Sequence, residues 1–342
     1  MLNQPIETTQ VIIVLSHALI AFMVAMLVTP IVTHFLYKYE FWKKARTTAA
    51  TGENAPIYQK LHAAKHKRNI PTMAGVIIWA TVALVTVLFN LDRKETWLPL
   101  FTIVVVGLLG VIDDYINVRG KSGLAGVKAQ FKSLWLILLA ILGGWWFYYK
   151  LGYSILHIPA VGNFDIGLLY IPLFIVVTFA TANAVNITDG LDGLSGGLLA
   201  SAFGAFGAIA FTLQLYHIAA FCAAVVGAIL VYTWFNIYPA RFFMGDTGST
   251  ALGFTLGVIA LLTNSVFVLP IIGFVFVVEA GSSLLQILSK KIFRRKIFLS
   301  APIHHHFEAI GWPETKVTMR FWVVGAVMSV VGLILGLLGR GS

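Results

Sequence analysis

Residues 11–37 read VIIVLSHALIAFMVAMLVTPIVTHFLY and contain no charged side chain. The stretch is long enough to cross the hydrocarbon core of a bilayer, which requires about 20 apolar residues in a helix. A membrane-spanning strand would instead show about 10 residues of alternating polarity, so this segment predicts a helix. The first basic residue is Lys38. The segment therefore lacks the basic stretch that precedes the apolar core of a cleaved signal peptide, and we expect the helix to be retained.

Similar apolar segments recur along the rest of the chain. They predict an all-α polytopic membrane protein with about ten transmembrane helices, forming a single domain over residues 1–342. Between the fourth and fifth segments, residues 151–167 combine glycine, proline and alternating apolar residues and predict a small hairpin. The expected helices lie near 11–37, 71–90, 97–112, 133–150, 168–183, 196–214, 218–235, 249–263, 267–288 and 319–338.

The amino-acid composition excludes an ordinary soluble domain. Hydrophobic residues make up 58% of the chain and charged residues only 11%, whereas about 25% of the residues of a soluble domain are charged. Cys222 is the only cysteine and lies in an apolar segment. Intramolecular disulfides and thiolate metal clusters are therefore excluded, and we expect Cys222 to be a small buried side chain.

The basic residues are divided unequally between the two sets of connections that ten helices would produce. One set holds only Arg93, Lys94, Lys150 and Arg340 of the 24 lysines and arginines. Because basic residues accumulate in cytoplasmic loops, the other face is expected to be cytoplasmic, with both termini on the outer side. The net charge of +10 follows from this topology, so we expect a lipid bilayer and no nucleic acid as partner.

Four polar segments interrupt the apolar sequence, and all belong to the expected cytoplasmic face. Carboxylates at a membrane boundary are costly unless they are paired, hydrated or bound to cations, so their accumulation on one face indicates a functional site. The segments are Val111–Tyr115, Asn183–Gly193, Asn236 with Phe242–Ser249, and Ala301–Glu308.

Each acidic segment also has an ordinary structural interpretation. Asp113 and Asp114 follow the third expected helix, but adjacent acids there oppose the helix dipole, which favours a functional role. Asp189–Gly193 resembles a calcium loop but lacks the EF-hand spacing and closing glutamate, so we favour two carboxylates that hold Mg²⁺ on a diphosphate. Asp246 lies in a turn that suits the N-cap of the eighth helix and also a charged ligand at that helix end.

His304, His305 and His306 are consecutive, and an apolar protein has little structural use for three adjacent imidazoles. Such side chains donate hydrogen bonds, carry a proton near neutral pH or bind an anion. Together with the carboxylates and basic residues of the same face, they indicate phosphoryl-group chemistry supported by Mg²⁺. A site of this kind in a membrane suits the joining of a soluble, nucleotide-activated donor to a lipid acceptor.

Taken together, the polar segments resemble those of the phospho-N-acetylmuramoyl-pentapeptide-transferases over nearly the whole chain. The histidine block is the most specific part, whereas the aspartate segments occur throughout the wider superfamily that transfers N-acetylhexosamine-1-phosphate to polyprenyl phosphate. Asn69-Ile70 and Ala74 depart from the family's usual sequence. The resemblance rests on Pro71-Thr72-Met73, Asp113-Asp114, Asn183–Gly193, Phe243–Ser249, and Ala301–Glu308 followed by Gly311-Trp312-Pro313.

The resemblance implies a multi-pass protein of the bacterial inner membrane, with ten helices, a cytoplasmic active site and a homodimeric assembly. It implies the transfer of phospho-MurNAc-pentapeptide from UDP-MurNAc-pentapeptide to undecaprenyl phosphate, with release of UMP and a requirement for Mg²⁺. The lipid-linked product would be the first such intermediate of peptidoglycan synthesis.

The resemblance also implies roles for individual residues at matching positions. Asp246 would be the metal ligand, Asp113 and Asp114 would lie beside the acceptor phosphate, and His304 would complete the catalytic set. Lys128 and Lys132 compete for one further basic position. The substrate-binding positions would be Lys67, Thr72, Lys121, Asn183, Asn186, Asp189, Asp192, Asn236, Phe243, His305 and His306.

Two reaction routes are open for this site. In a single displacement, one oxygen of undecaprenyl phosphate attacks the sugar-linked phosphorus of the donor; in the alternative, an aspartyl-phosphate forms first. Asp113 could accept a proton from the acceptor. A phosphate monoester, with its second pKa near 6, is nevertheless mostly dianionic at neutral pH, so positioning two anions would matter more than base catalysis.

Two other functions are compatible with parts of the sequence. The first is a transferase that uses UDP-GlcNAc or a related donor with the same acceptor. The second is a proton-coupled transporter, which would place its ionisable residues near the membrane midplane rather than at one surface. Glu279, inside the ninth expected helix, is either functional or paired within the bundle, and Gly281-Ser282-Ser283 after it predict a bend that opens the helix to a lipid tail.

Overall fold

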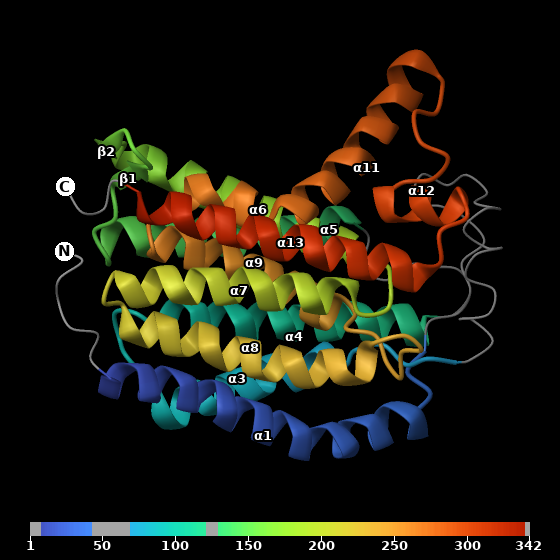
Figure 1. Cartoon of the computed structure of the whole chain (residues 1–342), viewed down its shortest axis with the longest axis horizontal. Coiled ribbons are helices and arrows are strands. Elements are labelled where there is room, and N and C mark those ends of the chain that lie inside the picture. The colour runs from blue at the N-terminus through green and yellow to red at the C-terminus, as the bar shows by residue number, and fades with distance from the viewer. Residues whose placement is uncertain (1–7, 43–68, 121–128, 339–342) are drawn as a thin grey trace.

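The computed structural model describes residues 8–42, 69–120 and 129–338 as a bundle of helices that run roughly side by side (Figure 1). The short strands β1 (Ile155–Ile158) and β2 (Gly162–Asp165) pair antiparallel as the expected hairpin. Short 3-10 turns lie at Gly167–Leu169 and Val266–Val268. The α-helices are α1 (Thr8–Lys38), α3 (Gly75–Phe89), α4 (Trp97–Arg119), α5 (Ala129–Tyr149), α6 (Tyr170–Thr188), α7 (Leu194–Thr212), α8 (Tyr216–Asn236), α9 (Asp246–Leu262), α10 (Leu269–Ile272), α11 (Phe274–Phe293), α12 (Ile303–Ala309) and α13 (Glu314–Leu337).

The lengths of these helices confirm an all-α polytopic membrane protein. Each of the ten predicted segments contains a helix. Among the described residues, seven helices are long and apolar enough to span a membrane, or up to eight if the bent pair at Val266–Phe293 counts as one span. The helices α3 and α9 are apolar but shorter, with 15 and 17 residues. Since a helix rises about 1.5 Å per residue, α9 is about 26 Å long, slightly less than a hydrocarbon core.

The short helix α9 lies at the centre of the bundle. Every residue from Thr247 to Leu262 is buried, and α9 packs against α4 and α6. Gly110 allows the close approach of α4, because a Cβ atom there would lie 2.5 Å from the backbone oxygen of Asp246. This contact brings the acids of α4 to the beginning of α9.

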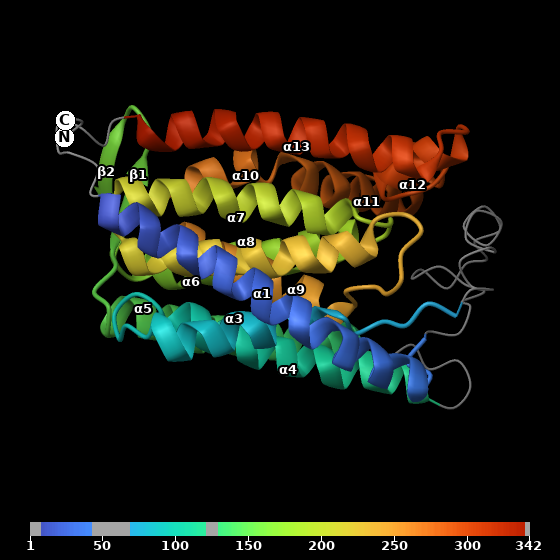
Figure 2. The ribbon, with the colours of Figure 1, turned by 60° about the horizontal axis from the view of Figure 1, so that its bottom comes forward.

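The two ends of the bundle are different. The first residues of α1 and the last residues of α13 lie with the β1–β2 hairpin at one end, here called the hairpin end (Figures 1 and 2). The helix α12 and the last residues of α4 lie at the opposite end, here called the site end (Figure 2).

The ninth predicted helix is bent, but the predicted position of the bend is wrong. The chain turns by 81° between Val266–Ile272 and α11, at Gly273, and α11 then projects away from the bundle (Figure 1). Gly281-Ser282-Ser283 lie inside the continuous α11. Ser282 Oγ donates to Glu279 O and accepts the backbone N–H of Ile303. Ser282 therefore binds the start of α12, and the three small residues do not interrupt α11.

Three predicted helix ends are also too early, those of the third, fifth and ninth expected helices. The helix α4 continues to Arg119, so Asp113 and Asp114 lie within it rather than after it. The apolar pattern continues through the buried Val118, and Arg119 in the last turn interacts favourably with the helix dipole. Likewise α6 continues to Thr188 and includes Asn183 and Asn186.

Candidate functional site

The beginning of α9 is held by an acid of α4. Asp114 is fully buried, and its Oδ2 accepts hydrogen bonds from the backbone N–H of Thr247 at 3.0 Å and from Thr247 Oγ1 at 2.9 Å. The positive charge that a helix dipole places at the N-terminus of α9 makes this position favourable for a carboxylate. The residue before the helix is Gly245, with φ +70°. The predicted capping role of Asp246 is therefore wrong, because Asp246 is already the first residue of α9.

Asp246 instead faces side chains from two neighbouring helices. Its Oδ1 accepts a hydrogen bond from Asn186 Nδ2 at 2.9 Å, and its Oδ2 forms an ion pair with Lys132. The ammonium group of Lys132 also lies 3.7 Å from Asp113 Oδ2. Asn186 donates a second hydrogen bond, to Ser249 Oγ at 2.8 Å. One cation thus lies between two carboxylates that come from α4 and α9.

A cavity of about 40 Å³ adjoins this cluster, and its lining includes Gly110, Asp113, Lys132 and Thr250. A cavity needs roughly 10–15 Å³ to hold one water, so this space admits a few waters or a small hydrated ion. The rest of the lining is apolar and comes from Val106 and Leu109 of α4 and from Trp135 and Leu136 of α5.

The donor set of the cluster fits Mg²⁺. Carboxylate oxygens are the ligands that Mg²⁺ prefers, and the ion is usually held by one or two carboxylates while waters and substrate phosphates complete its shell. Asp113 and Asp246 supply two such groups around one cation. Over the described residues, no group of three or more His, Cys, Asp or Glu side chains is arranged to hold a metal ion. The geometry therefore suits a metal shared with a substrate, not a cage formed by protein alone.

The Asp189–Gly193 turn is fixed by contacts with its neighbours. Asp189 Oδ1 accepts a hydrogen bond from Ser195 Oγ, and Asp192 Oδ2 accepts one from the backbone N–H of Ala240 at 3.0 Å. The N–H of Asp192 donates to Glu314 Oε1 at 2.7 Å. Asp192 thus connects this turn to the 237–245 loop and to the beginning of α13, whereas Asp189 contacts the first turn of α7.

Asn236, at the end of α8, joins the same two loops. Its side-chain oxygen accepts the N–H of Gly193 at 2.9 Å, and its amide nitrogen donates to the backbone oxygen of Phe242 at 2.7 Å. Asn236 is almost completely buried, so its position in the structure is that of a link between loops. Its role in binding the substrate remains a prediction.

Residues 71–74 lie against the loop that precedes α9. The N–H of Phe243 donates to Pro71 O at 2.8 Å, and the N–H of Ala74 donates to Phe243 O at 3.0 Å. Thr72 is buried beside Gly245. A Cβ atom added to Gly245 would lie 2.5 Å from Thr72 Oγ1. Although Asn69-Ile70 and Ala74 depart from the family's usual sequence, hydrogen bonds hold residues 71–74 against this loop.

Other predicted residues are placed apart or not described. Asn183 lies one turn before Asn186 on α6 and donates to the backbone oxygen of Phe179 in its own helix at 2.7 Å. Lys67 and Lys121 lie outside the described residues, as does Lys128. Lys132, which competed with Lys128 for one position, lies in the acid cluster.

The three histidines form the core of α12 and face three different partners. His304 Nδ1 lies 2.8 Å from Glu279 Oε2 of α11, and His305 Nδ1 lies 2.8 Å from Glu308 Oε2 one turn later. His306 Nδ1 accepts the N–H of Leu299 at 3.2 Å. Glu279 is thus paired inside the protein, and its partner is one of the predicted catalytic residues.

The far side of the His304 ring faces the Asp189–Gly193 turn. A Cβ atom on Gly190 would lie 2.4 Å from His304 Nε2, so only glycine permits this approach. The histidine block and the aspartate turn are therefore neighbours, although more than 100 residues separate them in the chain.

The environment of His305 determines its charge. Burial, together with the adjacent His304, lowers the pKa of His305 to about 4, although Glu308 and Glu279 act in the opposite direction. His305 is consequently neutral at neutral pH. His305 therefore does not supply a positive charge to a bound anion, which is one of the roles that three adjacent histidines could have.

Sequence reasoning missed several partners of the site. Lys132 was left as an alternative, and Ser249 and Glu314 were not singled out. Glu308 follows His305 by three residues, a spacing that places side chains on one face of a helix. That spacing was a usable signal once α12 was known to be helical. Nothing local in the sequence indicates the contact of Glu314 with Asp192.

Comparisons with known proteins agree with this arrangement. The family model Glycosyl transferase family 4 matches residues 96–264, a range that includes the aspartate segments but not the histidine block. A phospho-N-acetylmuramoyl-pentapeptide-transferase of Chloroflexus aggregans is 40% identical over 93% of this chain and 88% of the relative. The proteins of the same name from Geobacillus sp. (strain WCH70) and Bacillus subtilis (strain 168) are each 38% identical, over 92% and 94% of this chain and 95% and 97% of the relatives.

Proposed function

The chain belongs to the phospho-N-acetylmuramoyl-pentapeptide-transferase family, and we propose that it transfers phospho-MurNAc-pentapeptide from UDP-MurNAc-pentapeptide to undecaprenyl phosphate. UMP leaves, and the product is a lipid-linked peptidoglycan precursor. The observation that carries this proposal is the meeting of Asp113, Lys132 and Asp246 at the beginning of α9. A site for two phosphate-bearing substrates needs both acidic metal ligands and a cation, and this cluster contains both.

The cofactor of the proposed reaction is Mg²⁺. Asp246 would hold the ion together with Asp113, and Asn186 would fix the orientation of the Asp246 carboxylate. When bound, the ion would neutralise charge that develops on the phosphate oxygens. Lys132 pairs with the same carboxylates in the structure, so it would hold the cluster together before the metal and substrates arrive and afterwards offset phosphate charge.

The chemical step is a single displacement. An oxygen of the acceptor phosphate forms a bond to the sugar-linked phosphorus while the bond from that phosphorus to UMP breaks. Asp113 and Lys132 orient the acceptor phosphate, and His304 contributes a hydrogen bond on the donor side. Since the acceptor is already mostly dianionic at neutral pH, this chain's principal contribution is to hold two anions at reacting distance.

The proposed topology places the site end in the cytoplasm of a bacterial inner membrane, with ten spans and both termini outside. The distribution of described basic residues supports it. Arg93, Lys94 and Lys150 belong to connections at the hairpin end, whereas the site end carries Lys38, Arg119, Lys132, Arg241, Lys290, Lys291, Arg294, Arg295, Lys296, Lys316 and Arg320. Basic residues favour the cytoplasmic side, where a soluble nucleotide donor is available. The proposed assembly is a homodimer.

The identity of the lipid product tests the donor. Purified protein in detergent receives undecaprenyl phosphate and Mg²⁺ with either UDP-MurNAc-pentapeptide or UDP-GlcNAc, and the lipid extract is analysed by mass spectrometry. The proposal predicts a phospho-MurNAc-pentapeptide adduct of the lipid in the first case and none in the second. An adduct of GlcNAc-phosphate alone would retain the superfamily chemistry and reject the proposed donor.

A further inference from the structure

A cavity of about 420 Å³ lies at the site end between α1 and α8 and shares no lining residue with the acid cluster. We propose that it binds the phosphate-bearing head group of an anionic phospholipid from the surrounding bilayer. A volume of this size is typical of small-molecule sites. The cavity wall combines basic, aromatic and hydroxyl side chains, including Thr33, His34, Tyr37, Lys38, Phe235 and Arg241.

The charge of the cavity suits an anion. Lys38 and Arg241 are exposed cations on its wall, and none of the described residues that line it carries a carboxylate; Glu40, two residues after Lys38, is not among them. Arg119 adds positive charge nearby, because its guanidinium donates to the backbone oxygen of Tyr39 at 2.9 Å. Basic residues at a membrane surface attract anionic lipids over distances of about a Debye length.

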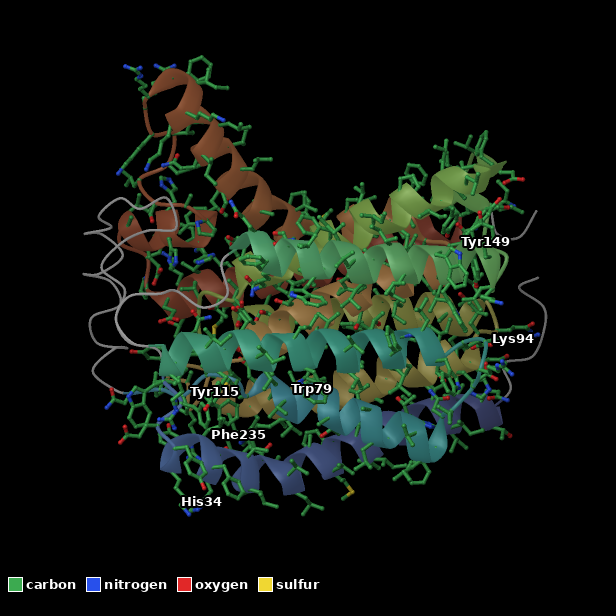
Figure 3. The ribbon with its side chains drawn as sticks, turned by 180° about the vertical axis from the view of Figure 1, so that it is seen from behind. His34, Trp79, Lys94, Tyr115, Tyr149 and Phe235 are labelled. Atoms are coloured by element: carbon green, nitrogen blue, oxygen red, sulfur yellow. The ribbon has the colours of Figure 1, made fainter. Side chains whose placement is uncertain are left out.

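The depth of the cavity matches the head-group layer. Figure 3 shows His34 and Phe235 at the same end of the bundle as α12, far from Lys94 and Tyr149. Close in sequence to the lining residue Phe235, Trp234 is 72% exposed and Tyr238 is 51% exposed, although both are large aromatic side chains. Exposed Trp and Tyr residues are typical of the boundary between the hydrocarbon core and the head groups. A bound phosphate here would thus remain attached to a lipid whose tails stay in the bilayer.

The acyl chains have an apolar surface beside the cavity. Leu27 and Ile31 of α1, about three and two turns before Lys38, are 74% and 59% exposed. An apolar face of this kind is the normal lipid contact of a spanning helix. One lipid molecule can therefore place its tails along α1 and its head group at Lys38.

The cavity also offers a fixed geometry and a hydroxyl donor. Tyr37 donates to the backbone oxygen of Arg241 at 2.7 Å, which ties the end of α1 to the 237–245 loop. Arg241 lies over the Phe235 ring, with 5.6 Å between its guanidinium carbon and the ring centre. Thr33 Oγ1 is buried, and within the described part of the chain no hydrogen-bond partner reaches it. Since buried hydroxyls are normally paired, an unpaired one on the wall of the cavity suits a polar ligand.

Native mass spectrometry of the detergent-purified full chain tests the proposal, with phosphatidylglycerol and phosphatidylcholine as probes. The pocket variant Lys38→Gln/Arg241→Gln is compared with Arg93→Gln/Lys94→Gln, which removes the same charge at the hairpin end. We expect the apparent Kd of the most tightly bound phosphatidylglycerol molecule to rise roughly 10- to 30-fold in the pocket variant. In the control it should change less than about twofold. Phosphatidylcholine binding should be similar in all three proteins.

A second variant tests the space inside the cavity independently of the charge on its wall. Thr33→Phe fills the space without altering any charge and should weaken phosphatidylglycerol binding while the thermal unfolding temperature stays close to that of the parent. Unchanged phosphatidylglycerol binding in both pocket variants, or equal weakening in the Arg93/Lys94 control, would overturn the proposal. Because no donor or acceptor substrate is present, the result does not depend on the transferase activity.

Discussion

Glu279 Oε2 lies 2.8 Å from His304 Nδ1, and neither side chain is exposed to solvent. The contact joins α11 to α12 and fixes the rotation of the imidazole, so that the opposite ring nitrogen faces the Asp189–Gly193 turn. The hydrogen bond made by one nitrogen of a histidine ring determines which nitrogen carries the proton. Glu279 is thus a positioning residue for His304 in the account given above.

Replacing Glu279 with Ala should lower kcat by roughly 10- to 100-fold, since losing the orientation of one group by about 1 Å is enough for an effect of that size. Glu279→Gln keeps an acceptor oxygen and should restore part of the activity. Steady-state kinetics should show the loss in kcat more than in the KM for undecaprenyl phosphate. Equal kinetics for the Glu279→Ala and parent proteins would contradict the positioning role of Glu279.

Asp114→Ala should destabilise the protein more than it alters substrate affinity. The Asp114 carboxylate accepts two hydrogen bonds from Thr247 at the start of α9, and leaving such buried donors without a partner costs about 1–3 kcal/mol each. Thermal unfolding in detergent measures the change. Asp165→Ala, on the exposed hairpin, is the matched control and should leave the unfolding temperature unchanged.

Lys132→Met should strengthen metal binding in the absence of substrates. Without the ammonium group, Asp113 and Asp246 repel each other, and a divalent cation relieves that repulsion. We expect Mn²⁺, followed by electron paramagnetic resonance, to bind at least about fivefold tighter, which corresponds to roughly 1 kcal/mol. Turnover should fall at the same time. Lys94→Met provides the control, and equal Mn²⁺ affinity in all three proteins would contradict the assigned role of the cluster.

The stability of the protein should decrease as the pH falls from 6.5 towards 4. The pKa of His305 is lowered to about 4 in the folded state by burial beside His304, whereas an unfolded histidine titrates near 6.5. Between these values the unfolded chain binds more protons, so acid favours unfolding. His305→Gln should make the unfolding temperature less dependent on pH in this range, and His306→Gln should not. An unchanged slope for His305→Gln would show that burial does not depress this pKa.

Much of this architecture could be predicted because hydrophobic length alone identifies a membrane helix. Residues 11–37 and the hairpin at 151–167 appear where the sequence placed them. The acid pair Asp113-Asp114 and Asp246 were singled out from their cost at a membrane boundary, and the fold brings Asp113, Asp114 and Asp246 together through one close contact, Gly110 against α9.

Other features depend on contacts between distant segments. The bend at Gly273 was misplaced because Gly281-Ser282-Ser283 are equally small. In the structure these three residues belong to a continuous helix, and Ser282 binds the distant Ile303. Lys132 could not be separated from Lys128 in the sequence, since the basic residues of this segment are irregularly spaced. The ion pair of Lys132 with Asp246 joins residues more than 100 positions apart and could not be read from the sequence.

UMP release is the most direct test of the central claim. Purified protein receives UDP-MurNAc-pentapeptide, undecaprenyl phosphate and Mg²⁺, and the same assay is run with Asp246→Asn and with Asp165→Asn as the matched control. The account predicts release that requires both substrates and the metal, is lost in Asp246→Asn and is retained in Asp165→Asn. Release that persists in Asp246→Asn, or that needs no acceptor, would contradict a single displacement at the beginning of α9.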